Sequence, residues 1–217
     1  MIGNRENSKI SKIIRVAGQL PLFTLDDLAS VETNKQYLRI LLSRYVKSGA
    51  VLRLKKGVYV AKNYIDRVER AGRARAYAEF LTGVLYEPSY ISLEYILHQH
   101  GLIPEAPVAV TAVARKKTAV FSTPFSTYRY HTIKPTLFTG FTSKRDGDYI
   151  IFRASAAKAL FDFLYFRKSH LENTEAIREL RININMFKKS DKRELAHYVK
   201  LEGSIRMKHI FTALWKN

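Results

Sequence analysis

Two hydrophobic periods follow one another in residues 34–62, and the change between them marks where a helix gives way to a hairpin. From residue 34 to residue 48, apolar side chains recur with the helical period and form one stripe, made of Tyr37, Leu38, Leu41, Leu42, Tyr45 and Val46. Gly49 predicts the end of this helix, because glycine readily adopts the left-handed conformation of a C-cap. Beyond it, residues 51–60 alternate as strands do, around a turn at residues 55–57.

Two shorter helices are predicted ahead of this helix and hairpin. Apolar residues at helical spacing predict a first helix that starts at Ser8 or Ser11 and ends near Ala17. Thr24 is a favourable N-cap for a second, short helix over residues 25–31. Three helices followed by a hairpin are typical of a winged helix-turn-helix, which we expect over residues 1–64.

The rest of the chain predicts a linker helix and a second domain. Arginines at 67, 70, 73 and 75 stud a helix expected at residues 65–84, running to about Thr82. In residues 85–217, a helix capped by Ser89 or Ser92 precedes strands expected at 108–113, 118–121, 127–133, 137–142 and 149–152. Helices are then expected from residue 154 and at 174–182, 190–201 and 204–215. The predicted fold class is α+β, with a small antiparallel sheet and packed helices in the C-terminal domain.

The composition adds a strong positive charge to this picture. The chain has 37 Lys and Arg against 19 Asp and Glu, a formal net charge of +18. Residues 1–66 carry +7 and residues 67–217 carry +11, so both parts are basic. A charge excess of this size indicates an anionic partner: nucleic acid, or less often a membrane surface or an acidic protein.

The cysteine content and the hydropathy indicate a compartment. The absence of cysteine excludes disulfides and favours a reducing environment. No apolar run reaches the roughly 18 residues of a membrane span, and the N-terminus lacks the apolar core of a signal peptide. We therefore expect a cytoplasmic protein with no membrane partner.

The outer face of the long helix and the hairpin predicts contacts with double-stranded DNA. In a winged helix the third helix enters the major groove and the hairpin lies along the backbone or minor groove. Because Gln suits adenine and Arg suits guanine, Gln36 and Arg39 are candidates for base contacts. Lys35, Arg44, Lys55 and Lys56 are interpreted as phosphate contacts. The complete predicted set is Lys35, Gln36, Arg39, Ser43, Arg44, Lys47, Arg53, Lys55 and Lys56. A merely solvated helix face and a protein-docking winged helix remain alternative interpretations.

Catalytic motifs that can be tested by their spacing are absent. Without cysteine there is no thiol nucleophile and no Cys-ligated zinc. His98 and His100 lie two residues apart and therefore on different sides of a helix, unlike the i, i+4 pair of a metalloprotease. Carboxylates do not cluster as a metal-dependent nuclease requires, and Asp146-Gly147-Asp148 is typical of a hairpin turn. We expect no catalytic residue, no metal, no cofactor and no enzymatic activity. The alternative function is a nucleic-acid-processing or RNA-binding accessory protein with a winged-helix module.

Three stretches carry a family resemblance. They read Lys-Ser-Gly-Ala-Val-Leu-Arg-Leu-Lys-Lys-Gly-Val-Tyr-Val at 47–60, Tyr-Ile-Ser-Leu-Glu-Tyr-Ile-Leu-His-Gln-His-Gly-Leu-Ile-Pro-Glu at 90–105, and Ser-Ala-Ala-Lys-Ala-Leu-Phe-Asp-Phe-Leu-Tyr at 155–165. By their order and spacing, which cover nearly the full chain, the protein resembles the AbiEi family of antitoxins and transcriptional regulators. Ala157 stands where that family usually has an acidic residue before the Lys or Arg of the third stretch.

This resemblance implies a function in a type IV toxin-antitoxin system of abortive infection, a phage defence. AbiEi-like proteins have an N-terminal winged helix, repress their own operon by binding inverted repeats in its promoter, and counter a co-encoded nucleotidyltransferase-like toxin without a stable complex. A monomer in solution that binds DNA cooperatively fits this scheme. The resemblance places the DNA-binding surface at Lys35, Gln36, Arg39, Arg44, Lys55 and Lys56. Candidates for an antitoxin or accessory DNA surface are Arg73, Arg75, Arg115, Lys116 and Lys117.

Overall fold

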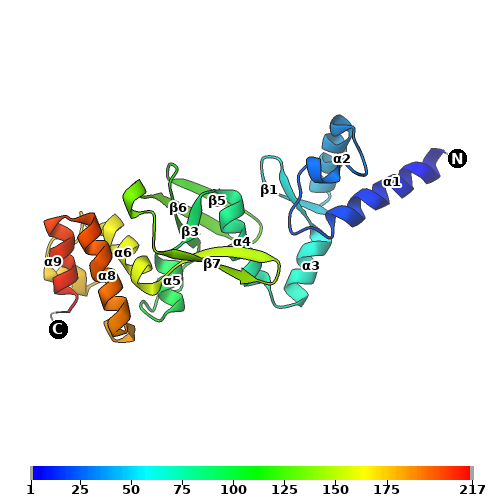
Figure 1. The fold of residues 1–217 in the computed structure, drawn as a ribbon. Helices are drawn as coiled ribbons and strands as arrows, with labels where there is room; N and C mark the ends of the chain where they lie inside the picture. The colour runs from blue at the N-terminus through cyan, green and yellow to red at the C-terminus, as the bar shows by residue number, and fades with distance from the viewer. Residues whose placement is uncertain (1, 216–217) are drawn as a thin grey trace. The chain divides into compact units, whose positions relative to one another are not determined.

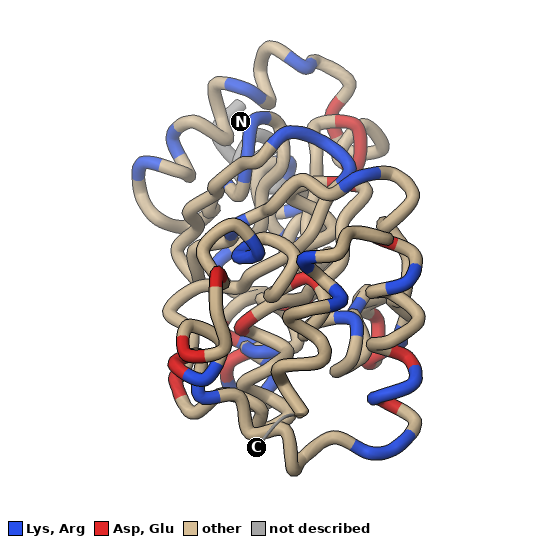
Figure 2. The backbone as a smooth tube through the Cα atoms, turned by 90° about the vertical axis from the view of Figure 1, so that its left-hand side faces the viewer, with Lys and Arg blue, Asp and Glu red and all other residues tan. Residues whose placement is uncertain are grey.

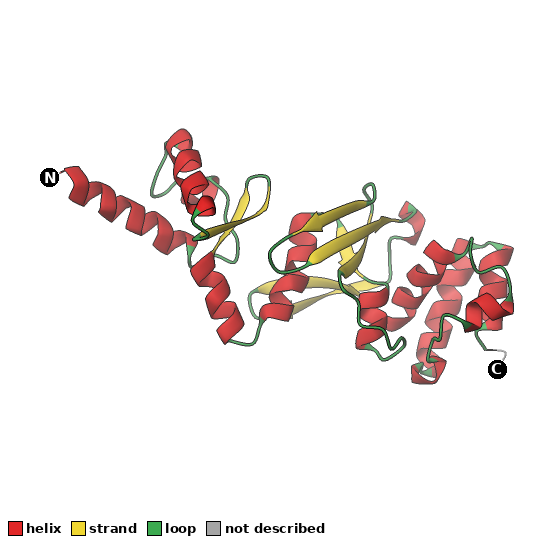
Figure 3. Ribbon diagram, turned by 180° about the vertical axis from the view of Figure 1, so that it is seen from behind, coloured by secondary structure: helices red, strands yellow, loops and turns green. Residues whose placement is uncertain are grey.

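The protein consists of two compact units. The computed structural model describes the backbone of residues 2–215 and the side chains from residue 9 onward. The units are Met1–Tyr77 and Ala78–Asn217, and the boundary falls inside helix α4 (Ala74–Leu85). Figures 1 and 3 show helices with a hairpin in the first unit, and a larger sheet with helices in the second. The fold class is mixed α+β.

The first unit contains the predicted long helix and hairpin. Its elements are α1 (Ile2–Ala17), the 3-10 helix η1 (Asp26–Leu28), α2 (Lys35–Lys47), β1 (Val51–Lys55), β2 (Val58–Ala61) and α3 (Lys62–Arg70). α1 ends where the sequence predicted but begins before Ser8 and Ser11, so neither serine starts the helix. α2 agrees with the predicted helix and stops ahead of Gly49, which has a positive φ of 75°.

The second predicted helix, over residues 25–31, was wrong as an α-helix. The chain forms only the 3-10 turn η1 there, followed by further turns. Thr24 is not its N-cap: the main-chain N–H and hydroxyl of Thr24 both donate to Asp27 Oδ2, at 2.7 and 2.8 Å. Burial of Leu28 fixes the turn against the core instead.

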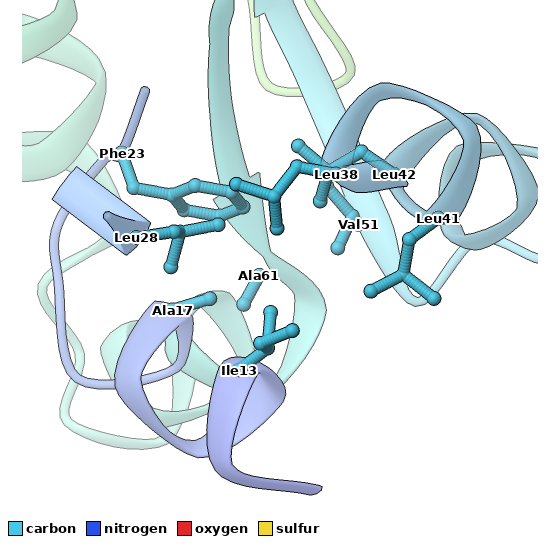
Figure 4. Packing of buried hydrophobic residues seen from close by; sticks show 9 residues of the cluster. All are labelled: Ile13, Ala17, Phe23, Leu28, Leu38, Leu41, Leu42, Val51 and Ala61. Carbon is cyan, nitrogen blue, oxygen red and sulfur yellow. The ribbon is translucent and has the colours of Figure 1, made fainter. Parts of the chain in front are cut away.

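One apolar cluster joins α1, η1, α2 and the two strands of this unit. Figure 4 shows its nine side chains converging from α1, the connection, η1, α2 and the two strands: Ile13, Ala17, Phe23, Leu28, Leu38, Leu41, Leu42, Val51 and Ala61. Phe23 and Tyr59 also form an antiparallel bridge, with N–H to carbonyl distances of 2.8 and 2.9 Å, and their rings stack. The connection that contains Phe23 is therefore tied to β2, and Tyr59 packs against the core.

The hairpin departs from strict alternation because of a bulge. β1 and β2 pair in the register Val51↔Ala61, Leu52↔Val60, Arg53↔Tyr59 and Lys55↔Val58. Leu54 is the extra residue of the bulge, which rotates the strand locally. Val51 and Leu54 are consequently both buried, although regular alternation would place them on opposite faces.

The single linker helix expected from residue 65 to residue 82 is two helices. α3 ends at Arg70 and α4 begins at Ala74, and Gly72 between them has a positive φ of 67°. That conformation is easy only for glycine and interrupts the helical path. Val68 of α3 and Leu81 of α4 are buried, whereas Ala71 and Ala74 beside the interruption are exposed.

The second unit is built on a six-stranded mixed sheet. Its strands are β3 (Ser89–Ile91), β4 (Val110–Ala114), β5 (Ala119–Ser122), β6 (Thr127–Thr132), β7 (Phe141–Asp146) and β8 (Tyr149–Ala154), in the order β5-β6-β4-β3-β8-β7. The predicted all-antiparallel sheet was wrong, since β3 pairs with β8, and β4 with β6, in parallel. The turn at 146–148 joins β7 to β8 as predicted, with Gly147 at a φ of 58°.

Two segments of this unit differ from the sequence prediction. Residues 89–91 form β3 rather than the start of a helix, and α5 runs only over Glu94–Gln99. Ser92 does not cap α5, because its hydroxyl donates to Asp162 Oδ2 at 2.7 Å. The strand expected at 137–142 starts instead as a 3-10 turn, η2 (Pro135–Leu137), before β7.

Helices cover the sheet and close the C-terminal end of the unit. They are α6 (Ala156–Arg167), α7 (Thr174–Arg178), the 3-10 helix η3 (Ile184–Met186), α8 (Lys189–Glu202) and α9 (Ile205–Ala213). The hydroxyl of Ser155 caps α6 by accepting from the N–H of Lys158 at 3.0 Å. α6 packs against α5, α8 and α9, and its residues 157–164 are all buried.

A buried ion pair connects α6 to β3. Lys158 and Asp162, one helical turn apart, are both 0% exposed. Lys158 Nζ donates to Asp162 Oδ1 at 2.6 Å and to the Leu137 carbonyl at 2.8 Å. Asp162 Oδ2 accepts from the hydroxyls of Ser92 and Tyr90, at 2.7 and 3.0 Å. Burial lowers the pKa of Lys158 and raises the pKa of Asp162, while their mutual attraction opposes both shifts.

Candidate nucleic-acid interface

The orientation of α2 follows from how its N-terminal end and its inner face are held. The side chain of Asn34 caps the helix, since its Oδ1 accepts from the N–H groups of Gln36 and Tyr37 at 3.0 Å each. Leu38 and Leu42 are buried on the inner face. The opposite face must therefore point to solvent.

The six α2 residues of the predicted DNA-binding set all lie on this outward side and are exposed. They are Lys35, Gln36, Arg39, Ser43, Arg44 and Lys47. α2 contains four basic residues and no acidic one. The structure therefore brings these residues together on one exposed, positively charged helix face, which we call the α2 face.

One member of the α2 face already has a partner. Lys35 Nζ lies 2.6 Å from Asp26 Oδ1 of η1, and both side chains are more than half exposed. An exposed ion pair of this kind contributes little to stability, so it does not prevent Lys35 from exchanging the carboxylate for a phosphate. The pair places Lys35 beside the turn rather than at the centre of the α2 face.

The sequence prediction missed one residue of the α2 face. Ile40 is 51% exposed among polar neighbours, and only its position outside the apolar stripe could have indicated this. An exposed aliphatic side chain on a groove-binding helix can contact the methyl group of thymine. Ile40 therefore joins the candidate base-contacting residues Gln36 and Arg39.

The hairpin supplies the rest of the predicted set. Arg53 and Lys56 are exposed, and Lys55 is half-buried. Arg53 Nε lies 3.4 Å from the Lys55 carbonyl, which holds the guanidinium near the turn. Gly57, at a φ of 79°, allows the tight reversal after Lys56. The hairpin tip therefore presents cations at its turn.

The predicted accessory residues lie in different units. Arg73 is half-buried and Arg75 is exposed, both near the start of α4 in the first unit. Residues 115–117 are exposed in the connection from β4 to β5 in the second unit, where Lys116 Nζ lies 5.6 Å from the centre of the Tyr86 ring.

Both units carry excess positive charge. Residues 1–77 contain 16 Lys and Arg against 6 Asp and Glu, whereas residues 78–217 contain 21 against 13. Figure 2 shows the basic positions distributed along the tube, with fewer acidic ones between them. The first unit, at about half the length of the second, therefore has the higher charge density.

Comparison with protein-family models and with curated proteins finds no match to this chain. Among the described side chains, those of residues 9–215, no three His, Asp or Glu gather as a metal site would require. None of the helices in that range is long and apolar enough to cross a membrane.

Proposed function

We propose that the first unit is a winged helix-turn-helix that binds double-stranded DNA. The observation that carries this proposal is the α2 face, on which four cations and no carboxylate stand opposite the buried side chains of Leu38, Leu41 and Leu42. In this proposal α2 enters the major groove and the hairpin lies along the backbone. Gln36, Arg39 and Ile40 contact bases, while the lysines of the hairpin tip neutralise phosphates.

The family resemblance extends the proposal from DNA binding to regulation. By analogy with AbiEi-like proteins, the chain represses its own operon by binding promoter inverted repeats. It also counters a co-encoded nucleotidyltransferase-like toxin through its second unit. A cytoplasmic location and the absence of enzymatic activity belong to the same proposal.

The test is to measure DNA binding by fluorescence anisotropy on the purified full chain. The probes are a duplex from the region upstream of its own gene and a scrambled duplex of equal length. Specific binding predicts a lower Kd for the upstream duplex, with log Kd rising linearly against log salt. Equal affinity for both duplexes across the salt range would exclude the repressor function.

A charge-reversal pair locates the interface. Lys55→Glu with Lys56→Glu is expected to weaken binding to both duplexes and, if each lysine meets one phosphate, to reduce the salt slope by about 2. The matched control, Lys200→Glu with Lys208→Glu, changes the net charge equally at exposed positions of α8 and α9. The assignment of the hairpin fails if the two pairs weaken binding to the same extent.

Arg39→Ala separates base contact from phosphate contact. Losing a good bidentate contact with a base costs about 1–3 kcal/mol of discrimination. The variant is therefore expected to bind the upstream duplex more weakly and the scrambled duplex nearly as well as the original chain. A uniform loss on both duplexes would instead place Arg39 on a phosphate.

A further inference from the structure

A cleft in the second unit, remote in sequence from the α2 face, has the features of a small-molecule site. Its volume is about 280 Å³, and its walls come from α5, the segment before β4, β6, α6 and the turn after α7. The residues that matter to the argument are Glu94, Glu105, Val108, Arg129, Arg167 and Leu180. This volume lies just below the range of about 300–1,000 Å³ typical of drug-sized ligands, so the cleft fits a smaller molecule.

One arginine of the cleft is already neutralised by a neighbour. Arg167 donates to Glu94 Oε1, and its guanidinium carbon lies 3.8 Å from the centre of the Phe163 ring. The ion pair and the ring together hold this arginine in place. Arg167 therefore shapes the wall and does not supply an available positive charge.

The other oxygen of the same carboxylate lacks a partner. Glu94 Oε2 is buried and accepts no hydrogen bond from any described residue. Leu93, directly before it, has φ 61° and ψ −143°, a conformation that residues other than glycine rarely adopt. Strained backbone of this kind persists where the surrounding structure enforces it, often at ligand sites. Here it sets Glu94, a residue of the cleft wall, as the first residue of α5, with one buried carboxylate oxygen left without a partner.

Two further charges of the cleft are uncompensated. Arg129 on β6 and Glu105 are both exposed, and neither side chain forms an ion pair or hydrogen bond within the described part of the chain. Burial lowers the pKa of the nearby His131, and the charges of Arg167 and Arg129 act in the same direction, while Glu94 opposes them. His131 is thus neutral at neutral pH, and the available charges of the cleft are one cation and one anion.

We propose that this cleft binds a small zwitterion of the α-amino acid type with an apolar side chain. Arg129 receives the carboxylate, and Glu105 with the free Glu94 oxygen receives the ammonium group. The ligand's side chain covers Val108, which is 91% exposed, and packs toward Leu180. This proposal is independent of DNA binding, and either can fail alone.

Calorimetric titration of the full chain with five L-amino acids tests the class of ligand: alanine, valine, leucine, methionine and phenylalanine. At least one should show saturable binding below about 10 mM, a weak but measurable affinity. For leucine as the binder, 3-methylbutylamine lacks the carboxylate and 4-methylpentanoate lacks the ammonium group. Each analogue should bind at least about tenfold more weakly, because one charge-assisted contact is lost.

Variants tie the binding to this cleft. Arg129→Gln should weaken leucine at least about tenfold and leave 3-methylbutylamine unchanged, since only the carboxylate contact is removed. Arg145→Gln removes an exposed arginine of β7 outside the cleft and should change neither titration. Thermal unfolding by circular dichroism checks that both variants keep the fold. The proposal is overturned if none of the five amino acids binds, or if Arg129→Gln binds the amino acid that the original chain binds as tightly as the original chain does.

Discussion

The buried ion pair of α6 yields the sharpest prediction about the second unit. Lys158→Met keeps a long, unbranched side chain among the rings of Tyr90, Phe161 and Tyr198, but leaves Asp162 without its cation. Removing one partner of a buried pair costs about 3–5 kcal/mol, because the remaining charge is uncompensated. Against a domain stability of about 5–15 kcal/mol, this is a large fraction.

A double variant distinguishes an uncompensated charge from lost packing. In Lys158→Met with Asp162→Asn, no buried charge remains, and the Asn carbonyl can still accept from Ser92 and Tyr90. We therefore expect the double variant to unfold at higher urea than Lys158→Met alone. The coupling energy between the two substitutions should exceed about 1 kcal/mol.

The single tryptophan makes the assay specific for the second unit. Trp215 follows α9, with Lys192 Nζ 4.0 Å from the centre of its ring. Its fluorescence during urea unfolding therefore reports on the unit that contains the ion pair. Lys200→Met is the matched control, because this exposed lysine of α8 should change the free energy of unfolding by less than about 0.5 kcal/mol. If Lys158→Met costs no more than Lys200→Met, or if the double variant is simply additive, the electrostatic reasoning is refuted.

Three further predictions use the same unfolding measurements, with circular dichroism added for the first unit. Gly83 lies inside α4 without a positive φ, and an added Cβ meets nothing within 4 Å, so Gly83→Ala should stabilise by about 0.5–1 kcal/mol. Asn34→Ala should destabilise the first unit by about 1 kcal/mol through loss of the α2 cap. Because burial lowers the pKa of His131, its stabilising contribution is complete above about pH 6.5 and declines as the pH falls toward its folded pKa. His131→Gln should make this acid loss shallower.

The local patterns of the first unit were sufficient to predict α2 and the hairpin. The apolar stripe, the helix end at Gly49 and the turn at Gly57 each depend on residues close together in the sequence, and the structure contains all three. The segment after Thr24 was not predictable in the same way. The Asp27 carboxylate accepts from both the main-chain N–H and the hydroxyl of Thr24, so that the two residues form a turn rather than a helix cap. The bulge at Leu54 depends on the core that β1 meets, which alternation alone cannot indicate.

In the second unit, the features that the sequence analysis missed depend on contacts between residues far apart in the sequence. Ser92 looked like a helix cap because its true partner, Asp162, is 70 residues away in the sequence. A signal for the ion pair was nevertheless present: Lys158 and Asp162 stand at i, i+4 in a helix whose other residues from 157 to 164 are apolar. Parallel pairing was missed because the short connections between strands favour hairpins.

The sequence predicted which α2 residues of the candidate DNA interface are exposed, but not the contacts that surround them. All the selected α2 residues lie on the outward face, because helical period fixes which side is buried. The ion pair of Lys35 with Asp26 and the exposure of Ile40 depend on where η1 and the hairpin pack, which no local pattern specifies.

The central position of β3 has a consequence for the order in which the chain can fold during its synthesis. β3 pairs with β4 across a short separation, Tyr90 to Val113, but with β8 only through Ile91 and Arg153, 62 residues apart. Closing that loop lowers the chain entropy before any contact between the two strands stabilises it, so this non-local parallel pairing forms late. The first unit has all its strand partners once residue 61 has been made. The second must keep one edge of β3 uncovered until residue 153 emerges from the ribosome.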